Sequence, residues 1–493
     1  MLAFRRQNHQ ENATVLGDLD ATEGLITELY TNAVEQLGSD TAPTRFGGLC
    51  ALERLAQDNP AQRQGIVNVI CAYLRMPFPP TAAGKPDPGA PGDQRMPVTE
   101  SETGTAGIGG IWQQEREVRL TAQRILAEHI RDDRIEDRQS TDHSSSRFWN
   151  NIRLDLSGAT LIDFSLVGGA MADANFHAAV FSGDASFSGA DFRGAARFGG
   201  ATFSGDASFA GATFRRAARF GGTTFGGAAR FGGATFRGAA SFPEAAFRAD
   251  ALFDGAAFGR DAGFRRVTFG GVAVFRGAIF DGDAWFKEAA FAGDARFGEA
   301  TFSSDAWFNE AAFTGDAGFD GTTFSGDAGF GEAIFSRGAW FNEAGFSRGA
   351  GFDRAAFGGD AWFDKVTFSR GAGFDRAAFA AGVWFGEAAF TGDAGFGEAT
   401  FGGDAWFDKV TFTRSASFGE ATFTGDAGFD GTTFSGGAWF GEATFRGGAD
   451  AVHFEQARIL SADASHVWPT GWRLAGADGG RYTVVRANDD GGS

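Results

Sequence analysis

The chain has 493 residues, with 75 Gly and 56 Phe against only 3 Tyr and 4 Met. A bias of this size is typical of a repeat protein rather than of an ordinary globular domain. The formal net charge of −19 and the pI of about 4.8 disfavour nonspecific binding to nucleic acid and charge-driven adhesion to an anionic membrane. We therefore expect an acidic repeat protein that makes no direct contact with nucleic acid.

The two cysteines and the first residues indicate the compartment. Cys50 and Cys71 lie in apolar helical patterns outside any CxxC pair, which predicts buried free thiols in a reducing environment. The opening MLAFRRQN reaches two arginines before any apolar stretch builds up, and no apolar run approaches the ~18 residues of a spanning helix. These features predict a cytoplasmic protein with no transmembrane segment.

The first 150 residues divide into three parts. Residues 1–76 predict an α-helical region, because Leu25, Leu29 and Ala33 recur at helical spacing and two further helical patterns follow before Pro77. Residues 77–110 are rich in Pro, Gly, Thr and Ser, which is typical of a flexible linker. Residues 111–150 predict one more helix and then an N-terminal cap around Trp149.

A period of five residues follows, with Leu156, Leu161 and Leu166 equally spaced and Ala159 two residues before its partner. Residues i and i+2 share one face of a strand, so both side chains of such a unit should point inward. From Phe181 to Phe445 the step alternates strictly between six and five residues, and the two resulting columns hold 49 of the 56 phenylalanines. The expected core ladder runs through Phe181, Phe187, Phe192, Phe198, Phe203 and Phe209, and ends with Phe434, Phe440 and Phe445.

Outward-facing residues distinguish a flat coil of 11 residues from a square coil of 22. One outward position is tryptophan every 22 residues, at Trp340, Trp362, Trp384 and Trp406. A second outward position alternates in charge every 22 residues, at Glu343, Lys365, Glu387 and Lys409. Opposite charges on adjacent rungs are favourable neighbours, which supports the longer coil. We therefore predict a mainly β fold, a right-handed quadrilateral β-helix over residues 151–465. Its 264 residues of strict repeat make 12 coils, or roughly 58 Å at about 4.8 Å per rung.

Beyond Phe445 the register slips, since the next ring is Phe454, and Ile459 is expected to be the last inward residue. Exposed rung edges promote end-to-end aggregation, so a cap is required. Residues 466–493, with Trp468 and Trp472, are predicted to form this C-terminal cap and a tail.

No pattern in the repeats predicts catalysis, a cofactor or a metal. Asp184, Asp206, Asp250 and further aspartates share one position of the 11-residue unit; a calcium ladder is one interpretation, and a turn residue that accepts backbone hydrogen bonds is the favoured one. The tryptophan column is interpreted as packing or self-association, with an aromatic strip for a ligand as the alternative. Because the repeat has no local departure where reactive groups converge, we expect a protein that is not an enzyme.

Charge divides the repeats into two parts. Residues 181–280 hold 12 basic and 7 acidic residues, a net of +5, whereas residues 281–446 hold 11 basic and 25 acidic residues, a net of −14. At about 4.8 Å per rung the second part carries about 0.4 negative charge per Å, against about 0.6 for duplex DNA. The basic part is able to pair head-to-tail with an acidic part of another copy, so a homo-oligomer is left open.

LDLSGATLIDF and units such as FSGDASFSGADF resemble the pentapeptide-repeat superfamily, in particular its phenylalanine-centred actinobacterial branch. The segments LYTNAVEQLGSD, RFGGLCALERLAQDNP and VICAYLRMP resemble the helical region that precedes the repeats in large members of that branch. The resemblance implies a scaffold or protein-interaction protein with an unknown protein partner, in which we expect the helical region to dock or oligomerise. Because well-understood members are short acidic dimers that mimic DNA and bind type II topoisomerase, DNA gyrase is an alternative partner. A membrane-associated assembly factor is a weaker alternative, since some relatives carry membrane spans.

Overall fold

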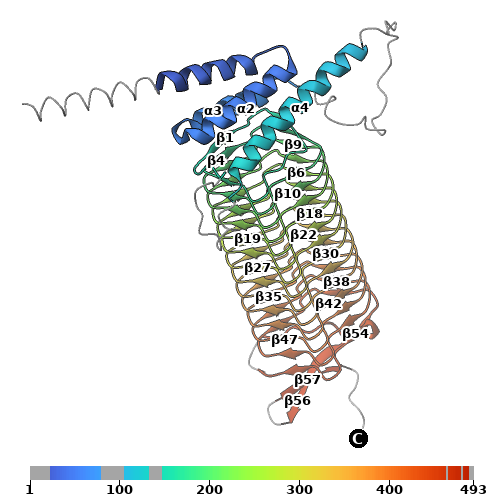
Figure 1. Cartoon of the computed structure of the whole chain (residues 1–493). Helices are drawn as coiled ribbons and strands as arrows, with labels where there is room; N and C mark the ends of the chain where they lie inside the picture. Colours follow the sequence, from blue (N-terminus) through green and yellow to red (C-terminus); the bar gives the residue numbers. More distant parts are fainter. Residues whose placement is uncertain (1–22, 79–104, 133–146, 462–464, 479–480, 488–493) are drawn as a thin grey trace, which may run out of the picture. The chain divides into compact units, whose positions relative to one another are not determined.

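A computed structural model describes residues 23–78, 105–132, 147–461, 465–478 and 481–487 (Figure 1). The chain forms two compact units, residues 1–194 and residues 195–493. The helices and the first repeats therefore cluster in one unit, although the period of the repeat begins near residue 150.

The first unit begins with helices. Residues 23–37 are helical, and α2 (Ala42–Asp58), η1 (Pro60–Gln62), α3 (Arg63–Leu74) and α4 (Thr105–Ile130) follow. Gly48 of α2 permits a close helix contact, because a Cβ there would lie 2.7 Å from the Ala33 carbonyl oxygen. Helix α4 starts inside the segment assigned to the linker, and residues 79–104 of that segment lie outside the described residues. Cys71 is buried and Cys50 is only partly buried, and both are free thiols.

The first strands of this unit pair in parallel across one coil. They are β1 (Arg153–Asp155), β2 (Thr160–Ile162), β3 (Ala170–Met171), β4 (Asp173–Asn175), β5 (Val180–Ser182), β6 (Ala185–Ser186) and β7 (Asp191–Phe192). Leu154 pairs with Ala174, and Leu161 pairs with Phe181. The partners are 20 residues apart in the sequence, because one coil here consists of four five-residue units. The same separation holds between Asp155 and its hydrogen-bond partner Asn175.

In the second unit one coil contains 22 residues, the length that the outward columns predicted. One coil contains β8 (Ala196–Arg197), β9 (Thr202–Phe203), β10 (Ala207–Ser208) and β11 (Thr213–Phe214), and the next begins with β12 (Ala218–Arg219). Paired positions are offset by 22 in the sequence, for example Ala196 with Ala218 and Thr202 with Thr224. This register excludes the flat, two-sided coil.

Every fourth strand of the second unit joins the same parallel sheet, so the coil has four sides (Figure 1). We name these sheets face 1 (β8 to β52), face 2 (β9 to β53), face 3 (β10 to β54) and face 4 (β11 to β55). Within the described part of this unit each face has twelve strands, of which the last are β52 (Ala438–Trp439), β53 (Thr444–Phe445), β54 (Val452–His453) and β55 (Arg458–Ile459). The four faces match the predicted quadrilateral solenoid.

Phenylalanine rings fill the interior. Phe198 stacks on Phe220 of the next coil at 4.8 Å with nearly parallel planes, and meets Phe209 edge-on at 5.3 Å. Eight members of the predicted ladder are at most 2% exposed, namely Phe181, Phe187, Phe192, Phe198, Phe203, Phe209, Phe434 and Phe440. Phe445 is the exception, because it is only half-buried. It lies on β53, the last strand of face 2 in the described residues, where the register slips.

The turns after face 1 and after face 3 each contain a residue with positive φ. Glycine fills many of these positions, such as Gly222 at 64°, but charged residues fill others, such as Glu288 at 59° and Lys365 at 57°. The left-handed region costs a residue with a Cβ free energy that it does not cost glycine. Charged side chains at these turns are thus present despite the backbone preference.

The described residues beyond β53 cover the C-terminal end. β54 and β55 pair with partners at an offset of 25 in the sequence, because η4 (Ala449–Ala451) is part of a three-residue insertion. Strand β57 (Arg481–Arg486) then pairs antiparallel with β55 and with β56 (Trp472–Asp478). The ring of Trp468 stacks on Phe440 at 6.0 Å, so an indole covers the last complete layer of the core.

The N-terminal edge is closed by side-chain amides. Gln123 of α4 donates to the Ile162 carbonyl at 2.7 Å and accepts from the Ile162 N–H at 2.8 Å. Gln64 of α3 bonds Arg153 of β1 in the same two ways, at 2.9 Å each. Each amide imitates the backbone of a preceding coil, which satisfies the exposed strand edge. Helix α3 belongs to the region predicted for docking, yet it helps to cap the first coil.

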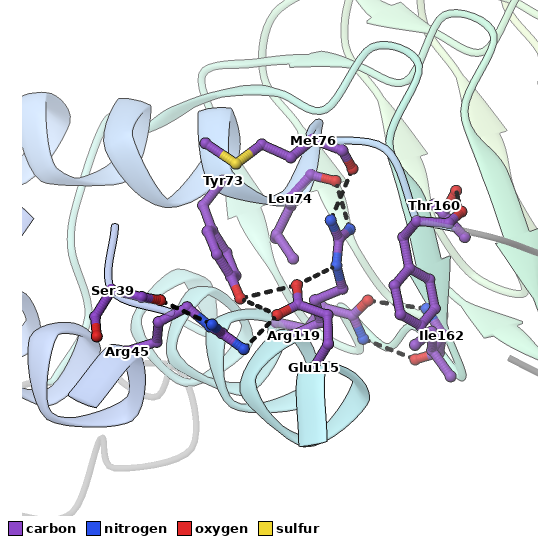
Figure 2. A network of polar contacts seen from close by, with 11 residues as sticks. Ser39, Arg45, Tyr73, Leu74, Met76, Glu115, Arg119, Thr160 and Ile162 are labelled. Carbon is purple, nitrogen blue, oxygen red and sulfur yellow. Dashed lines mark hydrogen bonds and ion pairs between the residues drawn. The ribbon is translucent and has the colours of Figure 1, made fainter. Parts of the chain in front are cut away.

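A buried arginine fixes these helices to one another (Figure 2). Arg119 is 1% exposed; it donates to the carboxylate of Glu115 at 2.8 Å and to the carbonyls of Leu74 and Met76 at 3.0 and 2.7 Å. The same carboxylate accepts from the hydroxyl of Tyr73 and pairs with Arg45 at 3.1 Å. Burial, followed by the charge of Glu115, raises the pKa of Tyr73. The network joins α2, α3 and α4 into one cap.

Candidate interaction surface

The predicted tryptophan column lies on face 3. It comprises β34 (Ala339–Trp340), β38 (Ala361–Trp362), β42 (Val383–Trp384) and β46 (Ala405–Trp406). Trp362 stacks on Trp340 at 4.9 Å and on Trp384 at 5.5 Å, with planes within 11° of parallel. A sugar or nucleobase requires an open ring face, and this stack uses the faces of Trp362 for its neighbours. The geometry therefore supports packing and disfavours the aromatic ligand strip.

Trp406 takes a different position at the end of the column. A Cβ on Gly428 of the next coil would lie only 2.4 Å from its ring, so this indole occupies the space beside that glycine. Trp340 lies in the same way against Gly338 of the preceding turn. The glycines beside the column thus provide the space that the indoles occupy.

Three further tryptophans lie on face 1 and were not selected from the sequence. Trp285 and Trp307 are neighbours on adjacent strands with ring centres 6.3 Å apart, and Trp285 is 42% exposed. Trp439 on the last strand is 48% exposed. The signal was their spacing in the other outward column, which has the same period as the first one.

The predicted charge column occupies the left-handed turn after face 3. Glu343, Lys365, Glu387 and Lys409 are all exposed and have φ between 56° and 59°. Within the described residues one of the expected ion pairs forms in this column, between Lys409 and Glu387 at 3.8 Å. The extended side chains at the other steps remain apart because each is free to turn toward solvent. The column is therefore an exposed row of mixed charge rather than a continuous ladder.

A better paired column occupies the left-handed turn after face 1. Arg376 donates twice to Glu398, at 2.7 and 3.0 Å, and Arg354 pairs with Glu332 at 3.1 Å. The carboxylate of Glu288 receives Arg266 at 2.6 Å, and this hydrogen bond lowers the pKa of Glu288. These residues also recur once per coil, and that spacing was the available sequence signal.

The aspartates that share one position of the repeat hold successive coils together. Oδ1 of Asp206 accepts the N–H of Ala228 at 2.9 Å, and Oδ1 of Asp327 accepts that of Gly349 at 3.0 Å. This is the favoured interpretation of the column, and the hydrogen bonds use oxygens that a calcium ion would need. The described residues contain no group of three or more His, Cys, Asp or Glu side chains able to hold a metal ion.

A second set of aspartates precedes the left-handed residues and is partly desolvated. Burial raises the pKa of Asp320, Asp353, Asp364 and Asp408. Their side chains nevertheless accept backbone N–H groups of the next coil, as Asp353 does from Asp375 at 3.1 Å. Their role is therefore to connect rungs.

Cysteine, histidine and carboxylate side chains meet in one groove of the first unit. Cys50, Glu53, His129 and Arg124 line it. His129 bonds Glu53 at 2.9 Å and the Arg147 carbonyl at 2.7 Å, and its ring stacks on Trp149 at 3.9 Å. Burial, followed by the charge of Glu53, raises the pKa of Cys50, so this thiol is held protonated and is a poor nucleophile. The contacts of His129 position Trp149, the predicted cap residue.

Helices that could cross a bilayer are absent from the described part of the chain, because none combines sufficient length with sufficient apolarity.

Comparison with known proteins identifies the repeat. A family model described as pentapeptide repeats (9 copies) matches overlapping stretches from 171–213 and 198–246 through to 407–450, more than half of the chain. The search of curated proteins and the search of solved structures gave no match. The inward phenylalanines, the four faces and the matched repeats agree, and the chain belongs to the pentapeptide-repeat family.

Proposed function

We propose that the chain is a non-enzymatic scaffold whose outward side chains on the second unit bind a protein partner. The observation that carries this proposal is the charge at the left-handed turns. Glycine would suit positions such as Glu343 and Lys365 best, as Gly321 does in the same column, yet exposed charged residues stand there. Selection for the fold alone would favour glycine, so we infer that the surface is kept for recognition.

The uniform interior also supports the proposal. Phenylalanine rings occupy it throughout, and outward columns are the places where composition changes from coil to coil. A scaffold of this kind presents side chains at a fixed rung spacing of about 4.8 Å. Such a surface suits a partner that makes repeated charged contacts.

Affinity capture with the full chain as bait tests the proposal. The capture is run from lysate of the native host at about 50 and about 500 mM salt, and recovered proteins are quantified by mass spectrometry. We expect a small set of partners whose recovery falls at the higher salt, because contacts between exposed charges are screened. A partner set recovered equally at both salt concentrations would contradict a charge-based scaffold.

The second candidate is an acidic DNA mimic that binds type II topoisomerase. Residues 281–336 hold 11 acidic and 2 basic residues, which favours this alternative. Residues 337–376, however, hold 6 basic and 5 acidic residues, so the acidic surface is interrupted. A gyrase supercoiling assay decides: inhibition or drug protection at stoichiometric dose supports the mimic, and no effect at tenfold excess rejects it.

We also propose assignment to the phenylalanine-centred actinobacterial branch, on the phenylalanine at the centre of each unit. A cytoplasmic location is proposed on the two free cysteines. Fractionation of native cells tests the location and the weaker alternative of a membrane-associated assembly factor together.

A further inference from the structure

Face 1 and the turn before it carry unpaired charges of one sign and then of the other. Arg197 and Arg219 lie on adjacent strands of face 1, and Arg216 and Arg237 lie on the turn that precedes this face. All four are exposed, and none has an ion pair within the described residues. We call these four residues the arginine end.

In the later coils that contain Asp281 and Asp305, the equivalent turn carries negative instead of positive charge. Asp281, Asp283 and Asp305 have no ion pair in the part of the chain that the structure describes, and we call them the aspartate end. Oδ1 of Asp283 accepts a backbone N–H at 3.3 Å and Oδ1 of Asp305 accepts one at 2.9 Å. Their second carboxylate oxygens remain available to an external cation.

Other arginines of the second unit form the ion pairs that these two ends lack. Arg230 pairs with Asp206 at 2.9 Å, and Arg276 pairs with Glu299 at 2.7 Å. At the arginine end, Arg197 and Arg219 instead stack at a strand spacing of about 4.8 Å, and like charges so placed are destabilising. An anionic partner outside the coil would relieve this repulsion.

The outward column of face 1 is complementary to itself when reversed. It reads Arg197, Arg219, Ser241, Gly263, Trp285 and Trp307 in successive coils. A two-fold axis between the third and fourth of these, lying in the interface and perpendicular to the coil axis, brings each arginine opposite a tryptophan of a second copy. Arginine over an indole is a favourable cation–π contact.

The same axis places charged residues of the turns opposite one another. Rotation about it places each turn opposite the same turn of the second copy, in reversed order. Arg216 then faces Asp281 and Asp283 of the second copy. Arg237 faces the turn that holds Arg260 and Asp261, and Glu244 in the turn after face 1 faces Arg265, which within its own chain also pairs with Glu288 at 3.2 Å. The small residues Ser241 and Gly263 lie at the axis and allow the two backbones to approach.

We propose that face 1 binds a second copy of this chain in an antiparallel, two-fold symmetric arrangement, with Arg216 of each copy against Asp281 and Asp283 of the other and with Arg197 and Arg219 against its tryptophans. Such an isologous contact closes on itself and yields a dimer rather than a filament.

The size of the contact predicts its strength. Six coils span about 29 Å, and a side of about five residues spans at most about 17 Å, so the flat area is roughly 1,000 Å² for both copies together. This is at the low end for protein interfaces. We therefore expect a weak dimer whose dissociation constant rises at least tenfold between about 50 and 500 mM salt.

Sedimentation velocity of the full chain tests the pairing through charge exchange. The variants R216E and D281R/D283R should each be monomeric, because like charges then face each other at both ends of the contact. An equimolar mixture of the two variants should restore the dimer, since every reversed charge meets its reversed partner. R370E, an exposed arginine on the same turn three coils beyond the contact, serves as the matched control and should dimerise like the parent.

Disulfide trapping tests the direction, in a background with C50S and C71A. Arg197 and Trp307 are the outermost opposed pair of the contact, so a mixture of R197C and W307C chains should crosslink. R197C alone should not, because its two copies then lie five rungs, or about 24 Å, apart, whereas a disulfide joins Cα atoms within about 7 Å.

Any of the following results overturns the proposal. The first is self-crosslinking of R197C, which indicates parallel copies. The second is the absence of the mixed crosslink in a sample that sedimentation shows to be dimeric. The third is a parent chain that is monomeric at about 100 μM and low salt, or a charge-exchanged mixture that stays monomeric. The fourth is binding of duplex DNA at the arginine end by a chain that forms no dimer.

Discussion

Replacing Phe319 by alanine removes a core ring that contacts four other phenylalanines. This ring is fully buried; it stacks on Phe297 at 4.9 Å and on Phe341 at 4.8 Å, and it meets Phe308 and Phe330 edge-on at 5.4 and 5.3 Å. A buried Phe→Ala change costs about 3–5 kcal/mol, and the aligned coils leave little room for collapse around the cavity. A cost of about 4 kcal/mol raises the local opening equilibrium by roughly 1,000-fold.

Hydrogen–deuterium exchange measured by mass spectrometry reports this opening coil by coil. Because each coil contacts only its neighbours, faster exchange should be confined to about one coil on either side of Phe319. Phe445 is the matched control: it is half-buried and stacks on Phe423, so Phe445→Ala should cost about 1–2 kcal/mol. Equal costs for the two substitutions, or uniform acceleration along the whole solenoid, would refute the reasoning.

Three further substitutions test other parts of the account. Gln123→Leu leaves the N–H and carbonyl of Ile162 unsatisfied and should lower stability by about 2–4 kcal/mol in urea unfolding, with Gln123→Glu intermediate; an unchanged midpoint would show that the amide is no cap. Lys365→Gly relaxes a residue with φ of 57° and should raise stability by up to about 1 kcal/mol, so a lower melting temperature would contradict the backbone argument. Asp364→Asn keeps the acceptor but removes a desolvated charge whose pKa is raised, so the folded state binds its proton more tightly than the unfolded state does. The aspartate therefore destabilises the fold above its folded pKa, and the advantage of Asp364→Asn at pH 7 should shrink as the pH falls toward 4; a constant difference would contradict it.

The repeat made the fold predictable, because its period is encoded locally and identically in each unit. The spacing of Trp340 and Trp362 was sufficient to select the longer, four-sided coil, and the structure pairs these two residues directly. Phe445 was assigned to the core by the same period, yet it is half-buried because the coil beyond it is out of register. Periodicity alone does not report what covers the end of a repeat.

Side-chain choices were harder to predict than the backbone. Opposite charges on successive coils were expected to pair throughout the column of Glu343, but among the described residues Lys409 and Glu387 alone do so there. The column of Arg376 and Glu398 is better paired, since a long exposed side chain selects among several rotamers. Gln64 and Gln123 gave no signal, because a polar residue on a helix resembles a solvent-exposed one until the strand edge beside it is known. The capping amides therefore required the structure.

In the proposed scaffold, outward charge rather than the core carries recognition. The variant E343G/K365G/E387G/K409G tests it directly, because its four turns take the glycine already present at Gly321 and Gly431 in the same column. We expect a melting temperature equal to or above that of the parent and at least a tenfold loss of partner recovery in affinity capture. Full recovery of the same partners by this stable variant would show that these four charges are not required for recognition.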